Sequence, residues 1–258
     1  TIGQVRCALM RLGFTDVRET AEGAALVTAE YAKLLSEGTR ENIISTCCPS
    51  VNALIEKYYP KLIPYLAPVV SPMIAHGRML KQGFTSAAVV HVCTCGAKAE
   101  EAVDVRHSTE INAVLTIDQL LSWMEKAGID LAARDEEPLL SDEGGAGELS
   151  AISGGMMECF QYTAPECSLR PIVASGLGDC RALLEELKKG ALKNCVIEMC
   201  ACQGGCVGGM EGSCIAGEGT KVHVDELDLN RFFHIFRICF SAASYAKNYR
   251  LWDKTQAI

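Results

Sequence analysis

Residues 195–209 read CVIEMCACQGGCVGG, and this stretch decides the fold. It opens on an apolar run, Cys195 to Ile197, typical of a buried strand, and passes at once into a glycine-rich loop that carries cysteines. Residues 42–58 and 87–101 repeat the arrangement of apolar strand, cysteine-bearing turn and helical pattern. Alternating strands and helices favour parallel βαβ units, which place ligands outside the carboxyl ends of their strands. We therefore predict an α/β fold in which three strand ends deliver cysteine.

Helix and strand patterns organise the rest of the chain. We expect helices over residues 5–12, 24–35, 116–128 and 178–189, and short strands over 14–18, 113–115 and 172–174. The acidic, glycine-containing stretch 133–147 is predicted to be a surface loop and the boundary between two lobes. The run from Phe232 to Tyr245 is interpreted as a packed helix.

Composition and charge exclude several classes of protein. The formal net charge of −8 gives no long-range attraction to phosphate backbones or anionic lipids. No stretch approaches the roughly 20 apolar residues of a membrane span, and no signal-peptide pattern opens the chain. We therefore expect a cytoplasmic protein without nucleic-acid or membrane partners. Because Thr1 runs directly into a helical pattern, one interpretation is that an N-terminal portion is missing.

Cysteine is frequent, at 14 of 258 residues. In a long acidic chain without an export signal, cysteines point to metal, cluster or thiol chemistry instead of a disulfide scaffold. Three segments are placed for it: Thr46-Cys47-Cys48-Pro49, Cys95-Gly96-Ala97-Lys98-Ala99-Glu100-Glu101, and the stretch from Glu198 to Gly209. Seven other cysteines show no CxxC pattern and are expected in the core: Cys7, Cys159, Cys167, Cys180, Cys195, Cys214 and Cys239.

Together the three segments resemble the signatures of FeFe (iron-only) hydrogenases, whose usual forms are TSCCP, PCxxKxxE and ExMACxGGCxxGG. Further similarity lies in Arg11–Phe14, Glu56–Pro60, Asn112–Thr116 and Ser153–Glu158, so it covers nearly the whole chain. The resemblance implies one catalytic domain over residues 1–258, with two lobes of parallel sheets flanked by helices. The cofactor, called the H-cluster, would lie between the lobes.

The resemblance also assigns the metal ligands. It implies that Cys48, Cys95, Cys202 and Cys206 ligate a 4Fe-4S cluster. The Cys206 sulfur would also bridge to a two-iron unit that carries CO, cyanide and an azadithiolate. Soft thiolates select iron–sulfur clusters, and four thiolates from three loops can surround a cubane that no single short motif encloses.

Three further side chains receive roles from the same resemblance. Lys98, three residues after Cys95, would donate to a cyanide ligand. Cys47 matches the cysteine that relays protons to the azadithiolate, since a thiol can exchange protons. The usual proton path continues through acidic residues on the preceding helix, where this chain offers Glu30.

Glycines and two substituted positions complete the expected pocket. Gly154 and Gly155 match a pair that lines it, and Gly204 and Gly205 let backbone approach the cluster closely. Cys93 and Cys200 stand where the family has methionines, and Thr94 and Val51 also depart from its pattern. Because residues around a cluster tune its potential, we expect lower turnover, as in divergent hydrogenases that act as hydrogen sensors.

Three functions are weighed. The first is a hydrogenase acting on H2 and protons, which implies a redox partner such as a ferredoxin or an accessory iron–sulfur domain, and maturation proteins that deliver the two-iron unit. The second is a non-catalytic 4Fe-4S protein of iron–sulfur assembly. Retention of Cys47, Lys98 and the Gly154–Gly155 pair favours the enzyme. The third is a zinc-stabilised module, which is weakest because Cys202 and Cys206 have no matching second pair.

Overall fold

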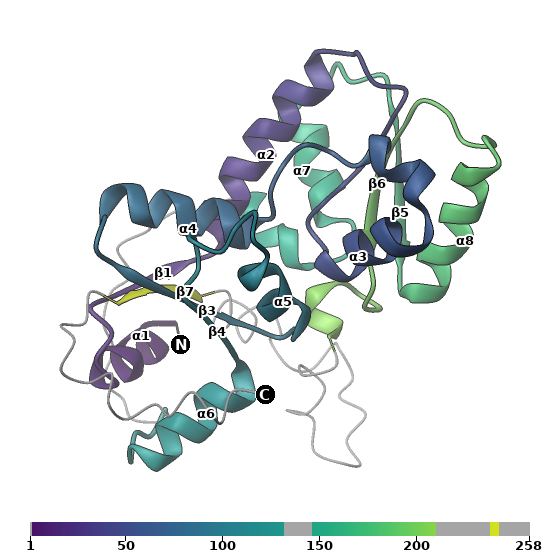
Figure 1. The fold of residues 1–258 in the computed structure, drawn as a ribbon. Helices are drawn as coiled ribbons and strands as arrows, with labels where there is room; N and C mark the ends of the chain where they lie inside the picture. The colour runs from purple at the N-terminus through teal and green to yellow at the C-terminus, as the bar shows by residue number, and fades with distance from the viewer. Residues whose placement is uncertain (1, 132–145, 210–237, 243–258) are drawn as a thin grey trace, which may run out of the picture.

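The computed structural model describes residues 2–131, 146–209 and 238–242, which form two α/β lobes (Figure 1). One lobe holds a four-stranded sheet of order β1-β7-β3-β4, and the other a three-stranded sheet of order β2-β6-β5. The strands are β1 (Asp16–Glu19), β2 (Asn42–Ile44), β3 (Ala88–Cys93), β4 (Ala113–Thr116), β5 (Arg170–Ser175), β6 (Cys195–Cys200) and β7 (Ile238–Ala242). The α/β fold with helices flanking the sheets is confirmed.

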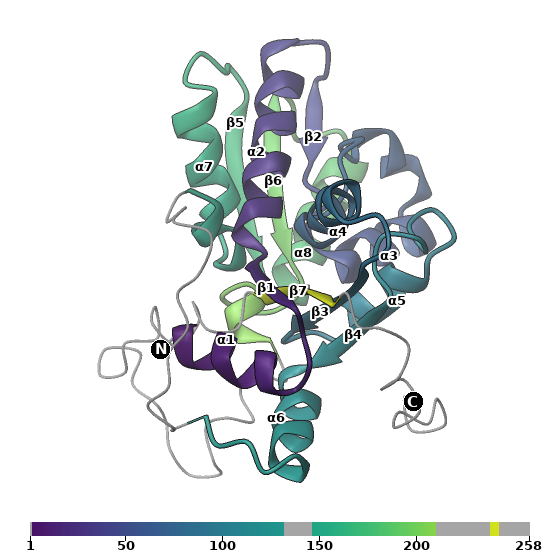
Figure 2. The ribbon, with the colours of Figure 1, turned by 90° about the vertical axis from the view of Figure 1, so that its left-hand side faces the viewer.

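The three-stranded sheet is parallel throughout, with Ile44 opposite Ile197 and Ile172 opposite the same residue from the other side. Helices α2 (Ala21–Ser36) and α7 (Gly155–Thr163) cover one face, and α3 (Pro49–Tyr58) and α8 (Leu177–Lys188) cover the other (Figures 1 and 2). Both faces of β6 are buried, which explains its continuous apolar sequence.

The four-stranded sheet is mixed. Strands β3 and β4 are parallel, whereas β7 runs antiparallel to both β1 and β3. Helices α1 (Ile2–Arg11) and α6 (Ile117–Lys126) pack on one face, and α4 (Pro72–Gly83) and α5 (Ala97–Val103) pack on the other. Short 3-10 helices are η1 (Pro60–Tyr65), η2 (Ala146–Ala151) and η3 (Cys206–Gly208).

Most expected elements are present, and one expectation is wrong. The expected capping box opens α6, where Thr116 and Gln119 exchange their hydrogen bonds. The helix expected across residues 232–245 is contradicted by β7, because Ile238–Ala242 is a strand between β1 and β3. The short apolar run ICFSA suits either a helix or a strand, and its place in the sheet decides it. The lobe boundary expected at 133–147 falls almost wholly outside the described residues.

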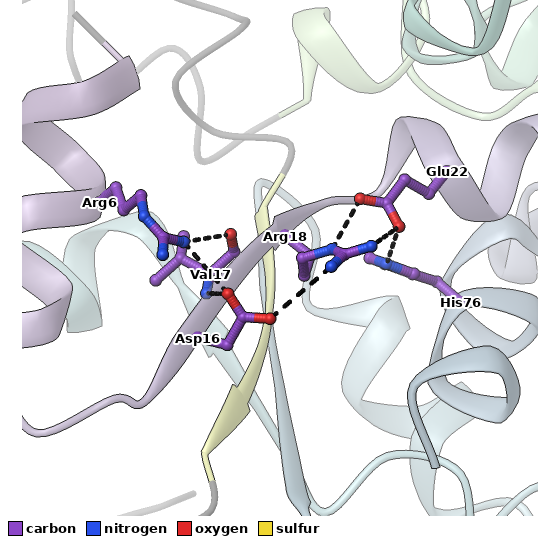
Figure 3. Close-up of polar contacts among 6 residues, drawn as sticks. All are labelled: Arg6, Asp16, Val17, Arg18, Glu22 and His76. Carbon is purple, nitrogen blue, oxygen red and sulfur yellow. Dashed lines mark hydrogen bonds and ion pairs between the residues drawn. The ribbon is translucent and has the colours of Figure 1, made fainter. Parts of the chain in front are cut away.

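Helix α2 joins the lobes by packing closely on α4. A Cβ atom at Gly23 would lie 2.3 Å from the Pro72 carbonyl oxygen, so only glycine allows this approach. Figure 3 shows the polar contacts beside this crossing, where Glu22 accepts two hydrogen bonds from Arg18 and lies 3.8 Å from His76. No helix among the described residues is long and apolar enough to cross a membrane.

Candidate metal centre

The structure delivers cysteines at the carboxyl ends of three strands, as the sequence predicts. Cys47 and Cys48 follow β2, and Cys48 is the residue before α3, whose first position is Pro49. Cys95 lies between β3 and α5, and Cys202 follows β6. Since β2 and β6 are adjacent parallel strands, their carboxyl ends meet at one edge of the sheet.

Two hydrogen bonds tie the three cysteine segments together across the lobes. The Thr94 hydroxyl, next to Cys95, donates to the Cys206 carbonyl at 2.8 Å. The Lys98 ammonium, on α5, donates to the Cys47 carbonyl at 3.3 Å. The segment after β3 therefore contacts both of the segments that leave the three-stranded sheet.

The four expected ligand thiols share one electrostatic neighbourhood. Cys206 is exposed as a residue, but desolvation of its sulfur raises the pKa of the thiol to about 12. The Lys98 ammonium opposes this rise, and the thiols of Cys48, Cys95 and Cys202 add to it. Among the described residues no three His, Cys, Asp or Glu side chains are close enough to hold a single metal ion. In a 4Fe-4S cubane each thiolate binds a different iron, so its four ligands need not meet at a single ion.

Lys98 is buried and paired within the site. Its ammonium donates to the Glu101 carboxylate at 2.7 Å, one helical turn along α5. Burial alone would lower the pKa of Lys98, but the Glu101 carboxylate outweighs it and the pKa is raised above its ordinary value. Cys206 and Cys48 raise the pKa of Lys98 in the same direction as Glu101.

Cys47 is half-buried beside Lys98. Burial raises the pKa of its thiol well above the ordinary value, and the Lys98 ammonium only partly offsets this. The preceding residue, Thr46, is anchored by buried Tyr31, whose hydroxyl accepts from the Thr46 N–H at 2.9 Å. Asn52 on α3 donates to the Thr46 carbonyl at 2.9 Å. The turn that carries Cys47 is thus held from both sides.

The glycine loop around Cys206 packs against the segment before α7. The Ser153 N–H donates to the Gly204 carbonyl at 3.1 Å, and Gly205 forms a β-bridge with Ile152. Gly205 adopts φ +90°, and a Cβ there would lie 2.5 Å from the Ser153 nitrogen. Gly154 also has positive φ, at +91°. The expected glycine pairs at 154–155 and 204–205 are therefore brought together.

The substituted positions make contacts that the usual residues could not. Thr94 stands where the family has proline, and its hydroxyl supplies the bond to Cys206 described above. The Cys93 thiol is buried and donates to the Cys95 carbonyl at 3.2 Å. The Cys200 thiol lies 3.7 Å from the Glu198 carboxylate. Burial and that carboxylate raise the pKa of Cys200 far above its ordinary value.

Glu30 is not brought to this group. It lies on the exposed face of α2 and pairs with Lys33 at 2.6 Å, whereas its neighbour Tyr31 points into the core toward Thr46. Of the spare cysteines, Cys159, Cys180 and Cys195 are buried as expected and Cys7 and Cys167 are half-buried; Cys214 and the side chain of Cys239 lie outside the described part.

Sequence reasoning did not assign two carboxylates that the structure places in the site. Glu101 pairs with Lys98, and Glu198 accepts from the Gly154 and Met157 N–H groups. The spacing of Lys98 and Glu101 by three residues in a helix could have indicated the first pair. No local signal indicates the second, because its partners are 44 and 41 residues away.

Several known proteins are similar to this chain in sequence or in fold. The chain is 26% identical over 261 residues to the periplasmic [Fe] hydrogenase large subunit of Nitratidesulfovibrio vulgaris, covering 81% of this chain and 62% of that protein. It is 24% identical over 230 residues to the cytosolic Fe-S cluster assembly factor narfl of Xenopus tropicalis, covering 69% and 48%. A solved variant of [FeFe]-hydrogenase HydA1 from Chlamydomonas reinhardtii superposes with a TM-score of 0.70 at 23% identity, covering 92% and 78%, which shows the shared fold.

These findings define an α/β protein whose relatives include a hydrogenase and an Fe-S cluster assembly factor. The model of the family "Iron only hydrogenase large subunit, C-terminal domain" matches residues 1–210, so the chain belongs to that family. The chain spans 62% of the length of the first curated relative and 48% of the assembly factor.

Proposed function

We propose that the chain is the H-cluster domain of an FeFe hydrogenase, which interconverts H2 with protons and electrons. The observation that carries the proposal is the contact of the Cys95 segment with both other cysteine segments, through Thr94 to the Cys206 carbonyl and through the buried ammonium of Lys98 to the Cys47 carbonyl. A cubane held by four thiolates is already anionic, and a neighbouring unit with cyanide ligands would add further negative charge for this ammonium to offset.

The residues fit the cofactor that the family implies. Cys48, Cys95, Cys202 and Cys206 would hold the cubane, since all four thiols lie in one neighbourhood and thiolate is the ligand that iron–sulfur clusters take. Cys206 would be shared with the two-iron unit, and its loop is free of side chains at Gly204 and Gly205. When bound, the cofactor supplies the redox centre at which hydrogen is made or split.

Protein groups then have separable tasks around that centre. Lys98 holds negative charge in place through its ammonium, which Glu101 keeps protonated. Cys47, fixed by the Thr46 anchors, holds a proton at its sulfur because burial disfavours the thiolate. The glycines at 154 and 155 give the pocket a wall without side chains. Cys93 and Cys200 line it where the family has methionine, and low turnover, as in a hydrogen sensor, is the form of activity that we propose.

The route of protons beyond Cys47 stays a proposal. Glu30 remains a proposed member, but its carboxylate is exposed and engaged with Lys33. Tyr31, the next residue, is fully buried and its hydroxyl lies 3.2 Å from the Thr46 hydroxyl. Replacing Glu30 with Gln is therefore expected to change turnover less than replacing Cys47.

A second function has support from one relative. The similarity to the assembly factor narfl fits a protein that keeps the cubane and makes no hydrogen. The proposed partners differ accordingly: H2, protons, a ferredoxin-like carrier and maturation proteins for the hydrogenase, and assembly partners for the alternative. A cytoplasmic location stays a prediction, and one relative is named as periplasmic.

The test is hydrogen evolution by the loaded chain. The protein is reconstituted anaerobically with iron and sulfide, then with a synthetic two-iron unit, and hydrogen is measured with a reduced dye. We expect slow but sustained evolution by the wild type and by Cys7→Ala, a control at another half-buried cysteine. Cys47→Ala should lower the rate by about 100-fold or more, the range of a lost acid–base group. A cubane-loaded chain that takes up no two-iron unit and evolves no hydrogen supports the assembly function instead.

A further inference from the structure

We propose that Glu198 is a positioning residue of the two-iron pocket, which fixes the Gly154–Gly155 turn and the Cys200 thiol against the loop carrying Cys202 and Cys206. The inference rests on the proposed function, because it assigns a task within that pocket. Glu198 is not one of the residues expected to touch the cofactor. It acts through the groups that do.

Each oxygen of the Glu198 carboxylate accepts a hydrogen bond from a backbone N–H at the start of α7. Oε1 accepts from the Gly154 N–H at 2.9 Å, and Oε2 accepts from the Met157 N–H at 3.1 Å. The first N–H groups of a helix have no partner within it, and Gly154, at the N-cap of α7, has no side chain to supply one. Glu198 lies on β6, is only 2% exposed, and accepts both of these bonds. The carboxylate therefore sets where α7 begins.

The same side chain also determines where the ligand loop lies. Glu198 is part of β6 and precedes Cys202 by four residues. The segment that it fixes at Gly154 continues into Ser153, whose N–H donates to the Gly204 carbonyl at 3.1 Å. A Cβ at Gly205 would come within 2.5 Å of the Ser153 nitrogen, so these two segments have no room to slide. A shift of the Gly154 turn must displace the loop before Cys206.

A second contact is specific to this chain. The Cys200 thiol lies 3.7 Å from Oε1 of Glu198. Cys200 ends β6 and precedes the expected ligand Cys202 by two residues. A methionine at position 200 has no S–H to donate to the carboxylate. Glu198 thus orients a thiol, where relatives have a thioether, beside the sulfurs that would surround the cofactor.

An ordinary helix cap is the plain alternative to this positioning role. A cap would stabilise the helix and leave the cofactor untouched. A positioning residue changes the cofactor itself, because the groups behind metal ligands typically alter affinity or activity by about 10–100-fold. Uptake of the two-iron unit and the infrared frequencies of its CO and cyanide ligands therefore separate the two roles, and unfolding temperature does not.

The experiment compares Glu198→Gln with Glu158→Gln in the cubane-loaded full chain. Glu158 is the matched control, because its carboxylate is exposed on the same helix. In Glu198→Gln, the new side-chain amide turns an N–H2 group toward one of the backbone donors and breaks that bond. We expect faster hydrogen exchange at Gly154 and Met157, uptake of the synthetic two-iron unit weakened about 10–100-fold, and shifted CO and cyanide bands. Glu158→Gln should match the wild type.

Cys200→Met keeps the inference testable if Glu198→Gln does not fold. It should retain the protection of the Gly154 amide and shift the infrared bands. The inference is overturned if Glu198→Gln takes up the unit with wild-type affinity and unshifted bands, even when its unfolding temperature falls, or if Cys200→Met leaves every band in place. A wild type without CO and cyanide bands overturns the proposed function, and this inference with it.

Discussion

Removing Lys98 gives the sharpest test of how the site is built, because the protein's stability and the cofactor depend on it for different reasons. Lys98 and Glu101 are 2.7 Å apart, and their side chains are only 10% and 11% exposed. Lys98→Met leaves the Glu101 carboxylate buried without its partner, a loss that typically costs about 3–5 kcal/mol. The bond to the Cys47 carbonyl adds about 1 kcal/mol.

The assay is thermal unfolding of the cofactor-free chain. For a chain of this size each kcal/mol lowers the midpoint by about 2–4 °C, so the combined loss of about 4–6 kcal/mol should make Lys98→Met unfold about 8–24 °C below the wild type. The double variant Lys98→Met/Glu101→Leu replaces the ion pair with apolar groups and should recover most of the loss, to within about 1 kcal/mol. Both variants should fail to retain the two-iron unit.

The chain provides a matched control for this pair. Lys33 and Glu30 have the same spacing in a helix and lie 2.6 Å apart, but their side chains are 67% and 56% exposed. Lys33→Met should therefore cost less than about 1 kcal/mol. The reasoning is refuted if Lys98→Met costs no more than Lys33→Met, or if the double variant is as unstable as the single one.

Three further outcomes follow from other contacts. Burial would raise the pKa of Glu22, but His76 and Arg18 outweigh burial and lower this pKa from an ordinary 4.5 to about 2. The ionised Glu22 carboxylate therefore stabilises the folded chain, and the wild type should lose this stabilisation as the pH falls from about 4.5 to about 2. Acid titration of unfolding should show a shallower slope there for Glu22→Gln, and an unchanged slope would exclude the effect. Gly205→Ala should cost about 1–3 kcal/mol from backbone conformation alone, measured by urea unfolding; a neutral result contradicts the φ of +90°. Thr94→Val removes the hydroxyl bond to Cys206 and should speed cubane loss to a chelator, followed by its absorbance, whereas equal rates would show that the bond is unimportant.

Local pattern is enough to predict the strands that deliver cysteine. The apolar runs at β2, β3 and β6 end where the cysteines begin, and parallel topology brings such ends together. The strand at Ile238–Ala242 is not predictable in this way, because its apolar residues suit a helix equally well and only the space between β1 and β3 decides. Periodicity alone does not distinguish a strand from a helix in a short apolar run.

The site shows the same division between local and distant information. The sequence spacing predicts that Lys98 lies near Cys95. The three-residue spacing of Lys98 and Glu101 in a helix also indicates their ion pair. Nothing local could show that Glu198 accepts from Gly154, since the contact depends on how α7 packs against β6. A helical pattern does hold the information that separates Glu30 from Tyr31, because Val27, Tyr31 and Leu35 recur at four-residue spacing on the buried face of α2.

The central claim is that these cysteines and Lys98 hold a cubane joined to a two-iron unit. Infrared spectroscopy of the anaerobically reconstituted chain tests it most directly, because bound CO and cyanide absorb where protein does not. The account predicts CO and cyanide bands in the wild type that persist in Cys47→Ala and disappear in Cys206→Ser. A chain that carries an intact cubane yet shows none of these bands would contradict it.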